Sequence, residues 1–403
     1  MAKDLLDTCH SQPTAFPSKG WMLMAIALAV GAMVASPLQA QTFKLMHTFT
    51  GGTDGANPAA GFVMNPAKTM MYGTTNGGGA NGAGVVYKLS LTGKLTPLYT
   101  FTGGADGGNP QSSLIFKGSF LYGTATSGGA NGQGAVYRVE TTGKQTVLYS
   151  FQGGTDGSDP QGRLAMDAAG NLYGTTYSGG AFGNGTVFEI TTKGKEIILH
   201  SFGTGEGACP VAGVTLDSAG NVYGTTSAGG AYGYGTVFEV AKTESGWTES
   251  TLHDFELTTD GGVPYAGLVF DASGNMWGAT TDGGDGGSNG GGTVFELSPV
   301  VGGWSFNTIA VVPGSGISGT FRDVLFDASG NLYATTHCDG NGAGSVYELA
   351  NGTWSYSVLY NFTGGNDGLY SFSNLVADAK GNMYGTTRYA GANGDGTAFK
   401  VTP

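Results

Sequence analysis

The chain has 403 residues, a formal net charge of −12 and a charged fraction of only 11%. It carries no cluster of Lys or Arg, which argues against binding to the phosphate backbone of a nucleic acid. Glycine contributes 76 residues, far above the usual ~7%. The glycines recur at fixed offsets between short apolar runs, and this indicates turns between strands, not a disordered chain.

The first forty residues have the layout of an export signal. Lys19 precedes an apolar run from Trp21 to Ala35, Pro37 ends that run, and Ala40 offers a small residue for cleavage. The run of about 15 residues is short for a membrane span, which needs about 20. We predict a signal peptide over residues 1–40 and a mature protein that is extracellular, on the cell surface or periplasmic. An uncleaved N-terminal anchor is the alternative.

A Tyr-Gly-Thr-Thr motif recurs every 50 to 56 residues through the rest of the chain. Its first position falls at Tyr72, Tyr122, Tyr173, Tyr223, Trp277, Tyr333 and Tyr384. Each repeat has four short β-rich segments, which in the third repeat are 163–166, 171–175, 186–190 and 196–202. Four antiparallel strands in about 50 residues make one blade of a β-propeller.

The two ends of the mature chain complement each other. Residues 43–49 match the fourth strand of a repeat, and the last repeat stops after its third strand, at 397–401. If the N-terminal strand completes the last blade, no sheet edge stays open. We therefore predict an all-β fold, a single domain over residues 41–403 that forms one closed seven-bladed β-propeller.

The pattern Gly-Asn-Leu-Tyr-Gly-Thr-Thr, followed by Gly-Gly-Ala-x-Gly-x-Gly-Thr-Val-Phe-Glu, resembles the tandem GloVer (Gloeobacter/Verrucomicrobia) repeat of secreted bacterial proteins. The resemblance covers the whole mature chain. It implies export and a repeat scaffold, and it supplies no catalytic residues. The Asp-x-x-Gly-Asn-Leu-Tyr hairpin is also similar to blades of NHL and gluconolactonase-type propellers.

Residues that recur in every blade are interpreted as structural. The aromatic residue of the Tyr173 series is expected to pack between blades, since a ligand site on a ring is rarely sevenfold. His47, His200 and His253 occupy a position that tyrosine fills in other repeats, so we interpret them as structural as well.

Two loops could hold a metal ion. His337, Cys338 and Asp339 replace the usual Gly-Gly loop of the sixth repeat, and Asp282 and Asp285 share a loop of the fifth. Imidazole, thiolate and carboxylate are all metal ligands, although a diverged loop is the simpler explanation of the first group. Elsewhere Cys209 and Cys338 fall in different repeats, and we expect both to be free thiols.

One acidic residue recurs in the loop before each first strand. The series is Asp54, Asp106, Asp156, Glu206, Asp260 and Asp367. Carboxylates in Gly-rich loops suit calcium, but one carboxylate per loop is too few, and Asp-Gly is also common turn chemistry. We therefore expect no cofactor and leave calcium open.

Aromatic residues that do not recur in every blade are the candidate ligand-binding residues. They lie in loops expected to share one face of the ring: Tyr177, Phe182, Tyr232, Tyr234, Tyr370 and Phe372. We predict a monomeric, secreted binding or scaffold protein, with a glycan or a surface protein as partner and no nucleic acid. The alternatives are a metal-dependent, gluconolactonase-like hydrolase or lyase and a purely architectural role.

Overall fold

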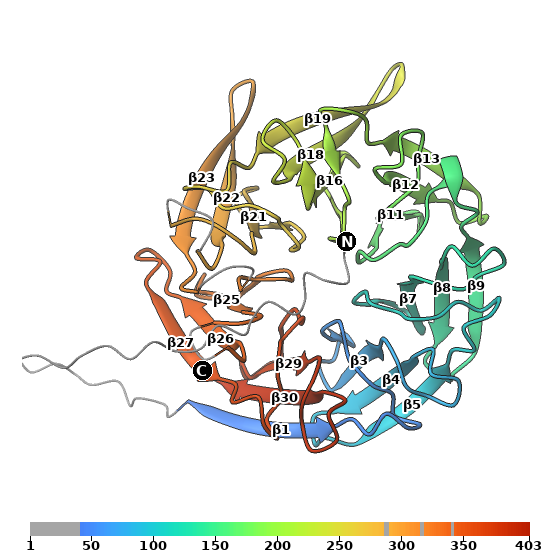
Figure 1. Cartoon of the computed structure of the whole chain (residues 1–403), viewed down its shortest axis with the longest axis vertical. Coiled ribbons are helices and arrows are strands. Elements are labelled where there is room, and N and C mark those ends of the chain that lie inside the picture. Colours follow the sequence, from blue (N-terminus) through green and yellow to red (C-terminus); the bar gives the residue numbers. More distant parts are fainter. Residues whose placement is uncertain (1–40, 286–289, 315–317, 340–341) are drawn as a thin grey trace, which may run out of the picture.

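The computed structural model describes residues 41–285, 290–314, 318–339 and 342–403. The predicted signal peptide therefore lies outside the described residues. The described chain forms seven four-stranded antiparallel sheets arranged around a central axis, with one 3-10 turn at Gly154–Asp156. Figure 1 shows the sheets as blades of a ring, which confirms the predicted seven-bladed β-propeller.

The blades follow one another in chain order. From the axis outward, blade 1 consists of β2 (Val63–Met64), β3 (Met70–Thr75), β4 (Val85–Ser90) and β5 (Leu95–Thr100), and blade 2 of β6 (Ile115–Lys117), β7 (Phe120–Ala125), β8 (Ala135–Glu140) and β9 (Gln145–Ser150). Blade 3 consists of β10 (Ala165–Met166), β11 (Leu172–Thr176), β12 (Thr186–Ile190) and β13 (Glu196–Ser201). Blade 4 consists of β15 (Thr215–Leu216), β16 (Val222–Thr226), β18 (Thr236–Thr243) and β19 (Gly246–Asp254). Blade 5 consists of β20 (Val269–Phe270), β21 (Met276–Ala279), β22 (Thr293–Val300) and β23 (Gly303–Val311). Blade 6 consists of β24 (Leu325–Phe326), β25 (Leu332–Thr335), β26 (Ser345–Leu349) and β27 (Tyr356–Asn361). Blade 7 consists of β28 (Val376–Ala377), β29 (Met383–Thr387), β30 (Thr397–Thr402) and β1 (Thr42–Thr48). A short extra ladder joins β14 (Gly207–Ala208) to β17 (Ala228–Gly229).

The N-terminal strand closes the ring. β1 pairs antiparallel with β30 from Thr42↔Thr402 to Thr48↔Thr397, with a bulge between Leu45 and His47. Figure 1 shows this strand, in blue, beside the red strands of the last blade. The pairing leaves β30 with a partner on both sides, so the edge that invites aggregation is covered.

The glycine and the first threonine of the Tyr-Gly-Thr-Thr motif have steric and hydrogen-bonding reasons. A Cβ on Gly174 would lie 2.7 Å from the Phe188 ring of the neighbouring strand, so only glycine leaves room for that ring. The hydroxyl of Thr175 donates to the carbonyl of Ala212 in the next blade, at 3.2 Å. The same bond between adjacent blades forms from Thr74, Thr124, Thr225, Thr335 and Thr386.

The aromatic residue of the motif packs against the following blade, as expected. Tyr173 is buried in a cluster with Val214 and Phe238 of blade 4, and Trp277 is buried with Val324 and Tyr347 of blade 6. The hydroxyl of the aromatic residue has a hydrogen-bond partner: in blade 3, the Tyr173 hydroxyl donates to Asp167 in the turn of the same blade. The core is therefore a series of apolar clusters, each shared by two neighbouring blades.

Candidate functional site

Two kinds of loop meet on one face of the ring, which we call the loop face. It comprises the loops that follow each outer strand and the Gly-rich loops between the second and third strands. In blade 3 they are joined by backbone hydrogen bonds between Ser158 and Ser178, at 2.8 and 3.2 Å. Isolated bridges at equivalent positions, such as Ala56↔Gly77 and Leu369↔Tyr389, repeat this contact around the ring. The loop face is therefore held by its own backbone.

The recurring acidic residues of these loops are bound by the outer strand. Tyr149 donates its hydroxyl to Asp156 at 2.6 Å, and the Nε2 atom of His200 lies 2.8 Å from Glu206. We call the outer-strand partners the clamp residues: His47, Tyr99, Tyr149, His200, His253 and Tyr360. Asp156 also accepts a hydrogen bond from the Gln152 N–H. These bonds account for the single carboxylate in each loop.

Four clamp residues lie beside a side chain from the outer strand of the next blade. Phe306 stacks on His253 with ring centroids 3.6 Å apart, and Phe43 stacks on Tyr360 at 3.9 Å. The equivalent residues, matched by strand register, form what we call the facing position: Phe43, Leu95, Gln145, Glu196, Glu249, Phe306 and Tyr356. Only Glu196 and Glu249 in this series are acidic, so two neighbouring junctions differ chemically from the rest.

At the junction of blades 2 and 3, two carboxyl groups lie close together. The Tyr149 hydroxyl donates to Asp156 at 2.6 Å, and its oxygen lies 3.1 Å from a carboxyl oxygen of Glu196. Burial, followed by the hydrogen bond and negative charge of Asp156, raises the pKa of Glu196 to about 9. Glu196 therefore holds a proton at neutral pH, and this relieves the repulsion between the two groups.

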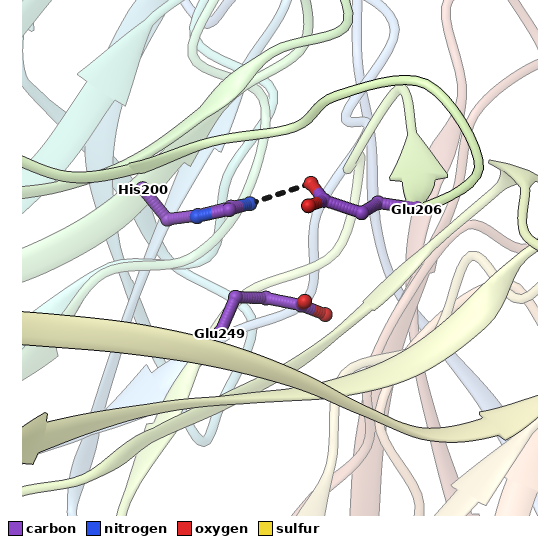
Figure 2. Close-up of side chains that lie close together, drawn as sticks. All are labelled: His200, Glu206 and Glu249. Atoms are coloured by element: carbon purple, nitrogen blue, oxygen red, sulfur yellow. Dashed lines mark hydrogen bonds and ion pairs between the residues drawn. The ribbon is translucent and has the colours of Figure 1, made fainter.

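At the junction of blades 3 and 4, the corresponding group contains an imidazole. The donor atoms of His200, Glu206 and Glu249 all lie within 4.8 Å of one another. Figure 2 shows the Glu249 carboxylate beside the His200–Glu206 pair, with all three side chains converging from two outer strands and a loop. Burial raises the pKa of Glu249, His200 lowers it and Glu206 raises it further. All three side chains are partly exposed.

Three of the six candidate ligand-binding aromatics are exposed on the loop face. The exposed fractions are 65% for Phe182, 56% for Tyr232 and 37% for Tyr234, and no other aromatic side chain in the described ranges is exposed to this degree. A cavity of about 450 Å³ lies at the junction of blades 2 and 3, and its lining includes Asp156 and Ala181, the residue before Phe182. We call Phe182, Tyr232 and Tyr234 the aromatic rim.

The other three candidates lie further inward. Phe372 is buried, and its ring lies 4.5 Å from the His337 ring, which also contacts Tyr370 at 4.3 Å. Tyr177 is half-buried, and burial together with Cys209 raises its pKa to about 12. The structure thus divides the six residues into an exposed rim and an inner group.

The four candidate metal residues do not belong to the group that Figure 2 shows. His337 is buried among aromatic rings, and burial with nearby Arg388 lowers its pKa to about 3. Asp339 accepts a hydrogen bond from the Thr336 hydroxyl at 3.2 Å. Asp282 accepts a hydrogen bond from the Gly283 N–H. Burial raises the pKa of Asp282, the Gly283 bond lowers it and Asp285 raises it again, so the pKa lies above its ordinary value.

The two cysteines of the repeats differ in their chemistry. Cys209 is a free thiol, whereas Cys338 is disulfide-bonded. The expectation of a free thiol is therefore confirmed for Cys209.

The centre of the ring is crossed by side chains. Arg322 of blade 6 donates to the carbonyls of Ala59 and Gln111, in blades 1 and 2, at 3.1 and 3.3 Å. Arg163 of blade 3 forms an ion pair with Asp323 at 3.2 Å. These contacts join blades 1, 2, 3 and 6 across the centre of the ring.

Sequence reasoning missed Glu249 and interpreted His200 as structural. Glu249 looks like an ordinary acidic residue on an exposed strand, 49 residues away from its imidazole partner. The available signal was its departure from the Phe, Leu, Gln or Tyr found at most facing positions. That signal is readable only after the outer strands have been aligned in register.

A sequence family matches nearly the whole described chain. The Gloeobacter/Verrucomicrobia repeat matches residues 29–238, 118–285 and 210–403. No curated protein matches the chain. Within the described residues there is no helix with the length and hydrophobicity needed to cross a bilayer.

Several solved structures share the fold at low sequence identity. The extracellular domain of a provisionally assigned one-component system from B. thetaiotaomicron is 11% identical with a TM-score of 0.55, and the match covers 89% of this chain but only 40% of that one. Provisionally assigned 6-phosphogluconolactonases from Bacteroides uniformis and Bacteroides fragilis are 15% and 16% identical, with TM-scores of 0.52 and 0.51. Those matches cover 81% and 85% of this chain and 89% and 98% of theirs. At such identities the likeness concerns the fold alone.

Proposed function

The chain belongs to the Gloeobacter/Verrucomicrobia repeat family, and on that premise we propose that it is an exported, non-enzymatic binding module that captures a glycan on its loop face. The observation that carries the proposal is the aromatic rim. Phe182, Tyr232 and Tyr234 are exposed, although the described aromatic side chains are otherwise buried or half-buried.

The chemistry of the rim suits a sugar chain. Aromatic rings stack on the apolar faces of sugar rings, and an anchor of this type contributes on the order of 2 kcal/mol at a binding hot spot. The cavity of about 450 Å³ that Ala181, the residue before Phe182, helps to line falls within the ~300–1,000 Å³ range of small-ligand pockets. Its lining includes Gln152, Thr155 and Ser201, whose polar side chains suit sugar hydroxyls.

The rim is also rigid enough to bind with little loss of entropy. Gly229 and Gly235, which flank Tyr232 and Tyr234, are joined by a backbone hydrogen bond at 3.1 Å. Residues on loops that a rigid scaffold positions are the usual place for recognition. A preorganised loop keeps more of its contact energy as affinity.

The test is a paired substitution in the fourth repeat. A Tyr232→Ala/Tyr234→Ala variant is screened beside the unchanged protein on a glycan array, and affinity for the best glycan is measured by calorimetry. We expect at least a tenfold loss of affinity with a nearly unchanged melting temperature. Tyr232→Phe/Tyr234→Phe keeps the stacking surfaces and is the matched control.

Two results would overturn the proposal. One is a large fall in melting temperature with glycan binding intact, since this would assign the rings to packing. The other is no glycan binding together with tight binding to a surface protein, because the partner would then belong to another class.

A further inference from the structure

We propose that His200, Glu206 and Glu249 form a binding site for a divalent transition-metal ion, with Zn²⁺ as the best match, at the outer junction of blades 3 and 4. The site goes beyond the glycan-binding role, because none of its ligands belongs to the aromatic rim. The juxtaposition in Figure 2 carries the inference.

The donor set matches the chemistry of zinc. One imidazole nitrogen and two carboxylate oxygens are ligands that Zn²⁺ prefers, and three protein ligands leave a fourth position for water or another oxygen. Bond lengths of about 2.0–2.1 Å place tetrahedral ligands about 3.3 Å apart. The donor atoms already lie within 4.8 Å of one another, so small side-chain rotations are enough. Hard cations such as Ca²⁺ take six or more oxygen ligands and match this set less well.

Glu249 does not contribute the aromatic packing that its equivalent in the next blade provides. At the next junction, the facing position holds Phe306, which stacks on His253 while His253 pairs with Asp260 at 2.9 Å. At the junction of blades 3 and 4, a carboxylate takes the place of that ring and faces the carboxylate of Glu206. Two carboxylates that lie this close carry a cost of charge repulsion. A bound dication would remove it.

The other acidic junction shows what happens when the imidazole is missing. There the clamp residue is Tyr149, and Glu196 relieves the repulsion by keeping a proton at neutral pH. A tyrosine hydroxyl and a protonated carboxyl group are poor zinc ligands. Of the two acidic junctions, only the one between blades 3 and 4 therefore has the nitrogen donor that zinc favours.

The site lies next to the aromatic rim. A Cβ built on Gly203 would lie 3.5 Å from the Glu206 Oε2 atom and 3.6 Å from the Phe182 ring. Both groups therefore border the same glycine. An ion held by Glu206 would stabilise the loop beside Phe182. Metal binding would therefore make this part of the loop face more rigid.

Zinc binding is tested on the exported protein, purified without a histidine tag and stripped with a chelator. Calorimetric titration with Zn²⁺ is expected to give one equivalent per chain with a dissociation constant in the micromolar range or below. Saturation should raise the melting temperature, because the ion binds only the folded state. Loading with Co²⁺ should give a visible absorption band that His200→Phe removes.

The decisive variant is Glu249→Phe, which copies the neighbouring junction with Phe306. Because the ring should stack on His200, the variant is expected to keep the melting temperature of the metal-free protein while losing at least tenfold in zinc affinity. Glu196→Phe, at the same position of the preceding blade, is the matched control and should bind zinc normally.

The proposal is overturned if the unchanged protein binds no zinc, or if Glu249→Phe binds it as tightly as before. The Tyr232→Ala/Tyr234→Ala variant separates this proposal from the glycan-binding role. We expect it to keep one equivalent of zinc, so either proposal can fail while the other stands.

Discussion

At the scale of single residues, deviation from the repeat carries more information than the repeat itself. The clamp residues and the acidic residues they hold recur because they fix the loops. Glu196 and Glu249 break the apolar or amide pattern of the facing position, and each lies next to a second carboxylate. The same substitution has two outcomes, since tyrosine faces one glutamate and histidine faces the other.

The first prediction concerns the proton on Glu196. Its pKa is about 9 in the folded chain against an ordinary value of 4.5, so between these values only the folded state keeps the proton. This contribution to stability is fully present below pH 4.5 and is lost as the pH rises to about 9. Glu196→Gln, the residue found at position 145, should remove that pH dependence. We expect it to be more stable than the unchanged protein by ~1–3 kcal/mol at pH 8, after allowance for solvent screening.

Urea unfolding at pH 5 and pH 8 measures the difference. The gain of Glu196→Gln should be small at pH 5 and larger at pH 8. An equal difference at both values would show that Glu196 is ionised in the folded chain. Lys195→Gln, on the preceding residue, controls for a change of charge outside the pair.

At the scale of secondary-structure elements, β1 has the largest structural role for its length. It supplies the outer strand of blade 7 and the clamp residue His47, and the fully buried Phe49 follows its last residue. Phe43 adds a stack on Tyr360, across the junction with blade 6. A segment at the start of the chain therefore holds the last blade and contacts the one before it.

Deleting residues 42–49 should destabilise the ring strongly. The deletion exposes the edge of β30 and removes Phe49, whose ring alone would contribute ~3–5 kcal/mol. We expect aggregation on size-exclusion chromatography and a much lower melting temperature. A synthetic peptide of residues 42–49 should restore part of the stability by pairing with β30. A monomeric deletion variant with an unchanged melting temperature would contradict closure by β1.

At the scale of the whole molecule, the centre of the ring and its loop face differ in chemistry. At the centre, a hydrogen bond of Arg322 and the ion pair between Arg163 and Asp323 join blades across the axis. The loop face carries an exposed aromatic rim and, beside it, the partly exposed His200 group. Both proposed sites use residues of the loops and outer strands, none of which takes part in the contacts across the axis.

The predicted export of the molecule has a direct test. Cleavage after Ala40 would leave a mature chain beginning at Gln41, one residue before β1 starts at Thr42. The closing strand would therefore survive processing intact. N-terminal sequencing of the protein secreted by its host should begin near Gln41. Finding Met1 on protein in the membrane fraction would favour the uncleaved anchor instead.

The sequence alone determined the architecture, because a propeller is built from contacts that repeat locally. The 50-to-56-residue period, the Asp-x-x-Gly-Asn turns and the complementary chain ends were enough to predict seven blades and their closure. Each blade contacts mainly its neighbours, so one well-read repeat describes the rest. The aromatic positions that pack between blades followed from the same logic.

Only the tertiary structure decided which side chains meet. Tyr232 and Phe372 look alike in sequence, yet one is exposed on the rim and the other is buried against His337. Glu249 meets His200 because two outer strands of neighbouring blades lie side by side, a contact that no local pattern encodes. Repetition fixes the backbone of such a ring, whereas its chemistry depends on single residues that the junctions between blades bring together.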